Sequence, residues 1–339
     1  MMRCLLKRFS GLLLVVAVLS LVAVAFAPTA ALAAKPAKPA KAEKAPDVKA
    51  AFDASKMGDM TGYDPANIVQ PTGDTIKIAV VASFSGPSAI NGQIYWLVVN
   101  WVAYDLNKRG GIFVDGKKKL IEVIKADHMG EVDQCKKVLE RMILQEKVHV
   151  LWGTDGSHMM RIINAAAEKH KVIAINATTM SDDLQDASNF SRYAFQASFS
   201  TEQIARAFAY YYGQIRKKET KFYILNQDYA FGRQYAAAFK QGLQEYYPTA
   251  TIVGEDYHKL FLTDYAPYLT KIKASGAEVI FSGDWLPDAG NLLKQARHMG
   301  VMLPIANVYF DDPNMLNEVG VEGTKGLVNI SSFWIANPQ

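Results

Sequence analysis

Cysteine is almost absent from this sequence of 339 residues, which contains only Cys4 and Cys135. Cys4 lies in a basic and apolar leader, so a cleaved chain would keep one thiol and could form no internal disulfide. The fold must therefore depend on hydrophobic cores, for which a content of 50% apolar residues is ordinary. Cys135 falls on the apolar face of an expected helix, where an inert buried thiol is far more common than a nucleophile.

The sequence also lacks the local patterns of common catalytic and cofactor sites. None of its six histidines pairs with another at the short spacing of a metal-binding helix, and cysteine is too scarce for a zinc site. Neither a G-x-S-x-G elbow nor a G-x-G-x-x-G dinucleotide fingerprint is present. We therefore expect no metal, no cofactor and no catalytic residue, and we predict that the protein is not an enzyme.

Basic and acidic residues nearly cancel in the main part of the chain, so neither sign of charge dominates. The formal net charge of +4 comes from basic residues in segments 1–33 and 34–50, because residues 51–339 carry 29 basic against 31 acidic side chains. A nucleic-acid-binding protein needs a basic field on its surface. We therefore expect no nucleic-acid partner.

The amino-terminal leader resembles a secretory signal peptide. Met1–Arg8 is basic, Leu12–Ala27 is apolar, and Ala31-Leu32-Ala33 provides a small-x-small cleavage site. An uncleaved membrane anchor is the alternative, but the apolar run is shorter than the ~20 residues that a span requires. We expect residues 1–33 to be removed on export to the periplasm, and residues 34–72 to form an Ala/Lys/Pro tether and an amino-terminal extension.

From Thr75 onward, apolar strand-like runs alternate with segments of helical periodicity. Buried strands are expected at 76–82, 120–126, 148–152, 172–176 and, after a break near residue 198, at 221–226, 251–256, 278–282 and 304–310. Helices of ten or more residues separate most of these strands, and Asp115-Gly116 predicts a tight hairpin turn. This alternation predicts an α/β fold with parallel sheets in two lobes, at 73–198 and 199–330.

Small and polar residues follow the strands of both expected lobes. Residues 150–157 run from a strand through Asp155 into a helix, where Ser157 is expected as an N-cap beside N–H groups that could receive an anion. Residues 280–287 do the same in the second lobe and carry Trp285 just past the strand. Because ligands of open α/β sheets bind beyond the carboxyl ends of the strands, the two segments could face each other across a cleft. A plain cap for Ser157 and core packing for Trp285 are the alternatives.

These residues, in this order, resemble the periplasmic leucine/isoleucine/valine-binding proteins of ABC importers, from about Thr75 to Ser332. The motifs that carry the resemblance are 78–81, Ser85-Gly86-Pro87 with Gly92, 107–112, 228–232, 269–277 and 293–297. The family implies two Rossmann-like lobes that close about a hinge on a small ligand (the type I periplasmic binding fold). It also implies a second hinge crossing at 331–339, where this chain ends before the further helices of family members.

The resemblance implies a set of ligand-binding positions. The carboxylate-binding hydroxyl of the family falls on Ser157, and the loop that holds both carboxylate and ammonium falls on Thr178, Thr179 and Met180. Aromatic positions of the second lobe fall on Phe231 and Trp285. The ammonium-binding Glu of the family falls near Tyr309, and Asn91 replaces a first-lobe aromatic.

The absence of that Glu leaves the ligand open. Asp155, Asp284 or Asp311 could pair with a ligand ammonium, since a buried unpaired charge is costly. Alternatively, the ligand is an amide, a urea-like compound or an aromatic acid, for which Trp285, Phe231 and Tyr309 would provide apolar walls. We expect a solute-binding protein that delivers an amino acid or a related small molecule to a membrane ABC permease, and a sensor module with the same fold is the alternative.

Overall fold

The structure, a computed structural model, describes residues 60–330 of the chain. The described residues all belong to one compact unit. The expected signal peptide at 1–33, most of the expected tether and extension, and the expected hinge crossing at 331–339 lie outside the described residues. We use lobe 1 for the chain around the first sheet, up to residue 198, and lobe 2 for residues 199–330.

The first sheet contains five parallel strands in the order β4-β1-β5-β6-β7. Its central strands are the Val- and Ile-rich runs that the sequence predicts, since strands buried on both faces are almost continuously apolar. The bounds are β1 (Ile76–Ala82), β4 (Ile121–Asp127), β5 (Val150–Gly153), β6 (Ile173–Asn176) and β7 (Ala194–Gln196).

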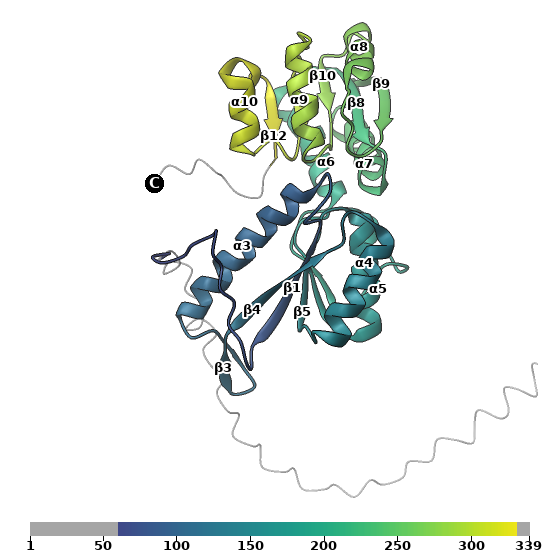
Figure 1. The fold of residues 1–339 in the computed structure, drawn as a ribbon. Helices are drawn as coiled ribbons and strands as arrows, with labels where there is room; N and C mark the ends of the chain where they lie inside the picture. Colours follow the sequence, from purple (N-terminus) through teal and green to yellow (C-terminus); the bar gives the residue numbers. More distant parts are fainter. Residues whose placement is uncertain (1–59, 331–339) are drawn as a thin grey trace, which may run out of the picture. The chain divides into compact units, whose positions relative to one another are not determined.

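Helices cover both faces of the first sheet. Successive side chains of a strand point to opposite faces of the sheet. On one face, Val80 packs with residues of α3 (Ala89–Lys108). Its neighbours Ala79 and Val81 instead join the core formed with α4 (Val132–Glu140) and α5 (Ser157–His170). Figure 1 shows α3 on one side of the strands, with α4 and α5 on the other.

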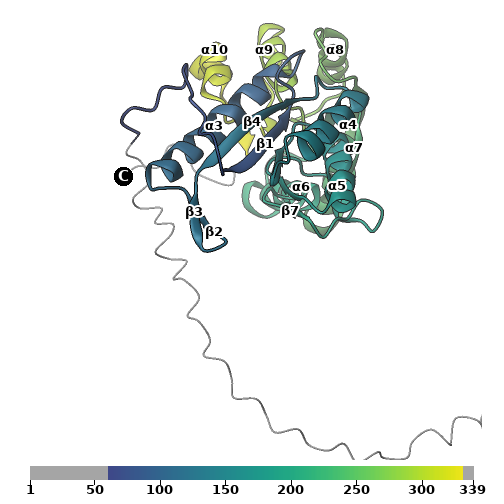
Figure 2. The same cartoon turned by 60° about the horizontal axis from the view of Figure 1, so that its bottom comes forward.

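A small hairpin follows α3, as the Asp115-Gly116 dipeptide predicts. Strands β2 (Ile112–Val114) and β3 (Lys117–Lys119) pair antiparallel, and Asp115 and Gly116 both have positive φ angles, of 51° and 79°. Two consecutive positive φ angles are the requirement of the type I′ turn that favours such dipeptides. Figure 2 shows the hairpin projecting from lobe 1.

The second sheet repeats the arrangement of the first. Its order is β12-β11-β10-β8-β9, again entirely parallel. The strands are β8 (Lys221–Gln227), β9 (Thr251–His258), β10 (Val279–Phe281), β11 (Ile305–Asn307) and β12 (Leu327–Asn329). Numbered within its own lobe, each sheet has the order 2-1-3-4-5. The switch points, where ligands bind in such sheets, therefore lie between β1 and β5 and between β8 and β10.

The second sheet is also covered on both faces. Phe222 and Phe281 pack with α6 (Thr201–Tyr210) and α7 (Ala230–Tyr246). Tyr223 and Ile280 pack on the other face with residues from α8 (Ala266–Ala274), α9 (Asp288–His298) and α10 (Pro313–Gly323). Lobe 2 therefore has two cores separated by one sheet, and this two-faced covering keeps its strand tips in fixed positions.

Strand β7, helix α10 and strand β12 were not expected from the sequence, and two expected helices are divided. Helix α10 and strand β12 close lobe 2, and α10 contains a non-helical residue at Gly320. Helix α4 continues into a π-helical turn at Arg141–Gln145, and α6 does so at Tyr211–Arg216. A three-residue strand and an interrupted helix are too short to show a clear periodicity.

We predict that Phe281→Ala lowers the free energy of unfolding by ~3–5 kcal/mol, the usual cost of removing a buried aromatic ring. Phe281 is fully buried and stacks on Phe239, with ring centroids 3.7 Å apart. Urea denaturation followed by circular dichroism measures the change. Phe195→Ala is the control, because Phe195 is 57% exposed, and it should change the free energy by less than about 0.5 kcal/mol. Equal losses in the two variants would contradict this description of the core.

Candidate functional site

One cavity of about 330 Å³ lies between the strand tips of the two lobes. Its size falls within the range of small-molecule sites. Lobe 1 and lobe 2 both contribute to its lining, which consists of Asn91, Ile94, Tyr95, Asp155, Gly156, Ser157, Thr178, Thr179, Met180, Tyr229, Phe231, Trp285, Leu286, Tyr309 and Asp311. Nine of the ten predicted site residues are among them, and their role in binding stays a prediction.

Ser157 begins α5 at the cavity, but it is not the N-cap that the sequence predicts. Gly156 occupies the N-cap position with a φ of 91°, and a Cβ there would lie 2.8 Å from the His158 ring. Only glycine adopts this backbone readily, and with Gly156 as the N-cap the helix begins one residue earlier than expected. The Ser157 hydroxyl accepts a bond from the Ser181 N–H at 3.4 Å and keeps its own proton to donate. Together with the first-turn N–H groups of α5, it forms an end of the cavity suited to an anion.

Thr178 and Thr179, which follow β6, hold the adjoining wall. The Thr178 hydroxyl donates to the Thr154 carbonyl at 2.7 Å and accepts from the Tyr95 hydroxyl at 3.1 Å. Thr179 donates both its hydroxyl and its N–H to the Asn176 side chain, at 2.8 and 2.9 Å. These bonds fix the loop from inside the lobe.

The Asp155 carboxylate is satisfied within lobe 1. It accepts bonds from the Ser83 N–H at 2.9 Å and the Ser88 hydroxyl at 3.0 Å, and it lies 3.2 Å from Nε2 of His128. Burial by itself raises the pKa of Asp155, but the contacts with His128 and Ser83 outweigh that effect and lower the pKa to about 2. Asp155 therefore stays ionised, and its oxygens are engaged in holding the loop between β5 and α5.

Lobe 2 supplies an aromatic wall. The Trp285 indole N–H donates to the Tyr229 hydroxyl at 2.8 Å, and the Phe231 ring meets the Tyr309 ring edge-on at 6.3 Å. Burial raises the pKa values of Tyr229 and Tyr309, so both phenols stay neutral. This wall is apolar in body and polar only at the hydroxyl and indole positions.

The cavity lining contains a second carboxylate, that of Asp311. Unlike Asp155, it receives no hydrogen bond from lobe 1 among the described residues. Burial raises its pKa, and the nearby Asp312 acts in the same direction. None of the fifteen lining residues is Lys, Arg or His. Asp311 thus lacks a basic partner in the lining, which is the condition under which a cationic group of a ligand would be favoured.

The lobes touch each other beside the cavity. Asn91, on α3, donates its amide to the Leu286 carbonyl at 3.3 Å. His158, on α5, meets the Tyr229 ring edge-on, with ring centroids 6.0 Å apart.

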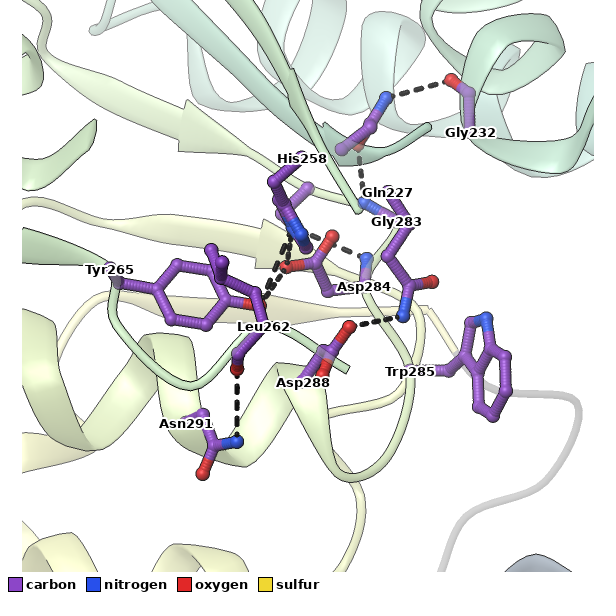
Figure 3. A network of polar contacts seen from close by, with 12 residues as sticks. Gln227, Gly232, His258, Leu262, Tyr265, Gly283, Asp284, Trp285, Asp288 and Asn291 are labelled. Carbon is purple, nitrogen blue, oxygen red and sulfur yellow. Dashed lines mark hydrogen bonds and ion pairs between the residues drawn. The ribbon is translucent and has the colours of Figure 1, made fainter. Parts of the chain in front are cut away.

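Asp284 does not line the cavity, which corrects the expectation from the sequence. Its side chain is fully buried, and its Oδ2 atom lies 2.8 Å from Nε2 of His258 and accepts a bond from the Tyr265 hydroxyl at 3.1 Å. Figure 3 shows this carboxylate between the two rings, with Trp285 extending away from them. The carboxylate turns inward because a buried charge needs partners, and His258 at the end of β9 provides one.

Sequence reasoning missed five residues of the lining, namely Ile94, Tyr95, Gly156, Tyr229 and Leu286. Tyr95 lies one helical turn after Asn91, so the (i, i+4) rule could have identified it. Tyr229 directly follows the β8 tip, where a ligand contact is expected. Between residues 60 and 330, no group of three His, Cys, Asp or Glu side chains is placed to hold a metal ion.

A family profile described as "Periplasmic binding protein" matches residues 75–339. The chain belongs to the periplasmic binding protein family. Its two lobes with parallel sheets are those of the type I fold. An amino acid binding protein of Pseudomonas aeruginosa is 27% identical to this periplasmic binding protein over 231 residues, which are 67% of this chain and 58% of that one.

Solved structures share the fold of this periplasmic binding protein. A solute-binding protein of an ABC transporter from Rhodopseudomonas palustris, in complex with 3,4-dihydroxybenzoic acid, is 25% identical with a TM-score of 0.64, covering 74% of this chain and 66% of that one. A branched-chain amino acid transporter substrate-binding protein from Streptococcus pneumoniae, in complex with isoleucine, is 24% identical with a TM-score of 0.64, covering 75% and 70%.

This chain spans about three fifths of the length of the curated relatives that it matches. Within residues 60–330, no helix has both the length and the apolar character needed to cross a bilayer.

We predict that Asp155→Asn lowers the free energy of unfolding at pH 7 by on the order of 2 kcal/mol. The pKa of Asp155 lies below that of an unfolded Asp, so its contribution is present above pH ~4 and is lost as the pH falls toward 2. Urea denaturation between pH 7 and pH 3 should therefore show wild type and variant converging in acid. Asp133→Asn is the control, since its side chain is 87% exposed. A constant difference across this pH range would exclude the proposed cause.

Proposed function

We propose that this protein captures a small solute carrying both a carboxylate and an ammonium group, namely an amino acid, and delivers it to a membrane ABC permease after export to the periplasm. The observation that supports this most directly is the chemistry of the shared cavity. The lining combines the Ser157 hydroxyl and the N-terminus of α5 with Asp311, which has no basic partner in the lining.

The cavity favours a zwitterion over a simple acid. A benzoate-like ligand would bring a negative charge into a lining that has two Asp and no basic side chain. A ligand ammonium placed at Asp311 would offset the cost of burying that carboxylate. The aromatic rings of Trp285, Phe231 and Tyr309 would then surround the apolar part of the ligand.

Capture operates by population shift. A ligand held between Ser157 and Trp285 contacts both lobes only while they are closed, so its binding energy favours the closed state. The Asn91 bond to the Leu286 carbonyl belongs to that state as well. The closed form is then the one that the permease receives.

Isothermal titration calorimetry tests the proposal on the purified protein after unfolding and refolding to remove bound solutes. The titrants are the common L-amino acids and, as the competing class, benzoate and hydroxybenzoates. We expect at least one amino acid to bind in the micromolar range and the aromatic acids to bind far more weakly. If no titrant binds more tightly than millimolar, capture of these solutes is wrong, and preferential binding of hydroxybenzoates would overturn the zwitterion assignment.

Asp311→Asn should weaken binding of the amino acid by at least tenfold, or about 1.4 kcal/mol, because it leaves the ligand ammonium without a charged partner. Asp312→Asn is the matched control. It removes the same charge one residue further along, outside the lining, where Asp312 caps α10 by accepting a bond from the Asn314 N–H at 2.9 Å. Asn is an equally good cap, so this variant should bind as the wild type does. Equal affinities of the Asp311 variant and the wild type would remove Asp311 from the site.

A further inference from the structure

A buried cluster behind the aromatic wall holds the loop 282–287 of lobe 2. The Gly283 N–H donates to the Asn226 side chain at 2.7 Å, and the Asn307 amide donates to the Asp284 carbonyl at 2.9 Å. This loop presents Trp285 to the cavity and the Leu286 carbonyl to lobe 1. Whatever anchors Asp284 therefore determines where the wall and the interlobe contact lie.

The anchor of Asp284 is His258, and hydrogen-bond geometry determines its proton content. Nδ1 of His258 lies 2.8 Å from the Lys259 carbonyl, which can only accept, so Nδ1 carries a proton. Nε2 lies 2.8 Å from Oδ2 of Asp284. Without a proton between them, two lone pairs would face each other at that distance. The pair therefore holds a second proton, as an imidazolium bound to a carboxylate.

Lobe 1 contains a pair in the same topological position with one proton fewer. His128 directly follows β4, as His258 ends β9, and it faces Asp155 across the tip of β1. Its Nδ1, however, accepts a bond from the Gly130 N–H at 3.1 Å, so the ring needs a proton only on Nε2. The lobe 1 anchor is complete with a neutral ring, whereas the lobe 2 anchor is not.

The surroundings of His258 are acidic or phenolic. Burial lowers the pKa of His258, but the contacts with Asp284 outweigh it and the pKa is raised, with Asp288 adding to the effect. Tyr265 and Tyr268, from the region of α8, meet the ring edge-on at 5.0 and 6.0 Å. Asp228, beyond β8, is exposed and bonded to Arg233.

The acid closest to the pair is already engaged. Asp288 accepts bonds at its Oδ2 from the Gln227 amide at 2.7 Å and the Phe261 N–H at 2.8 Å. Among the described residues, the side-chain groups that raise the pKa of His258 are the acids Asp284 and Asp288. The environment therefore favours the protonated ring.

We propose that the proton shared by His258 and Asp284 positions the Trp285 loop, and that its loss at alkaline pH releases the loop from the cavity. A neutral His258 would leave the Asp284 carboxylate buried with only the Tyr265 hydroxyl as a side-chain partner, since Oδ1 of Asp284 has none among the described residues. The cost of this buried charge is relieved only if Asp284 moves, and Asp284 is the residue next to Trp285. The contribution of the pair is complete below the ordinary His pKa of 6.5 and declines as the pH rises through the raised value.

His258 is thus a positioning residue for the cavity. Only the effect of its proton on solute capture rests on the proposed function. Its test needs no ligand. The protein is labelled with 5-fluorotryptophan, and the Trp285 signal in the ¹⁹F NMR spectrum is assigned by its loss in Trp285→Phe. Imidazole ¹⁵N signals of His258, assigned by their loss in His258→Gln, report its protonation over pH 6 to 10.

We expect His258 to be doubly protonated at pH 7 and the Trp285 signal to shift with the same midpoint as His258, above pH 6.5. Asp284→Asn should lower the His258 midpoint and abolish this transition of Trp285. His128→Gln, in lobe 1, should leave it in place. A neutral His258 at pH 7, or a Trp285 signal that does not change with the His258 titration, would overturn the proposal. These outcomes are independent of whether any amino acid binds, so they separate this inference from the proposed function.

Discussion

A carboxylate buried just past the third strand of each lobe constrains the loops that build the cavity. Such a group is costly to bury unless donors surround it. In lobe 1, Asp155 obtains its donors from the β1 tip and from His128, which fixes the turn leading to Ser157. In lobe 2, Asp284 obtains them from His258 and Tyr265, which fixes the turn leading to Trp285. The ligand-facing residues are thus held by the polar residues behind them.

The alternating pattern predicts most of the fold because it follows directly from burial. Strands covered on both faces must be apolar throughout, so the runs at 76–82 and 221–226 can be recognised without any structure. Helix α10 and strand β12 were missed for a physical reason. Gly320 interrupts the helical backbone, and three half-buried residues give no period to detect.

The sequence predicts which positions lie near the cavity, but it does not predict which way their side chains point. Asp155 and Asp284 both follow the third strand of their lobe closely, and the sequence treats them alike. Only the structure shows that β9 ends with His258 beside Asp284, which turns that carboxylate inward. Asp155, in contrast, still borders the cavity. The same limit explains the N-cap of α5, since nothing in the residue types shows that Gly156 rather than Ser157 takes the capping backbone.

The bond between Asn91 and the Leu286 carbonyl has a consequence for the evolution of selectivity. Its acceptor is a main-chain oxygen, which every residue type possesses. Replacement of the side chain at position 286 or its neighbours can therefore reshape the apolar wall while leaving this link between the lobes chemically intact. A binding protein built in this way can change its solute selectivity by mutation and still keep this main-chain contact between its lobes.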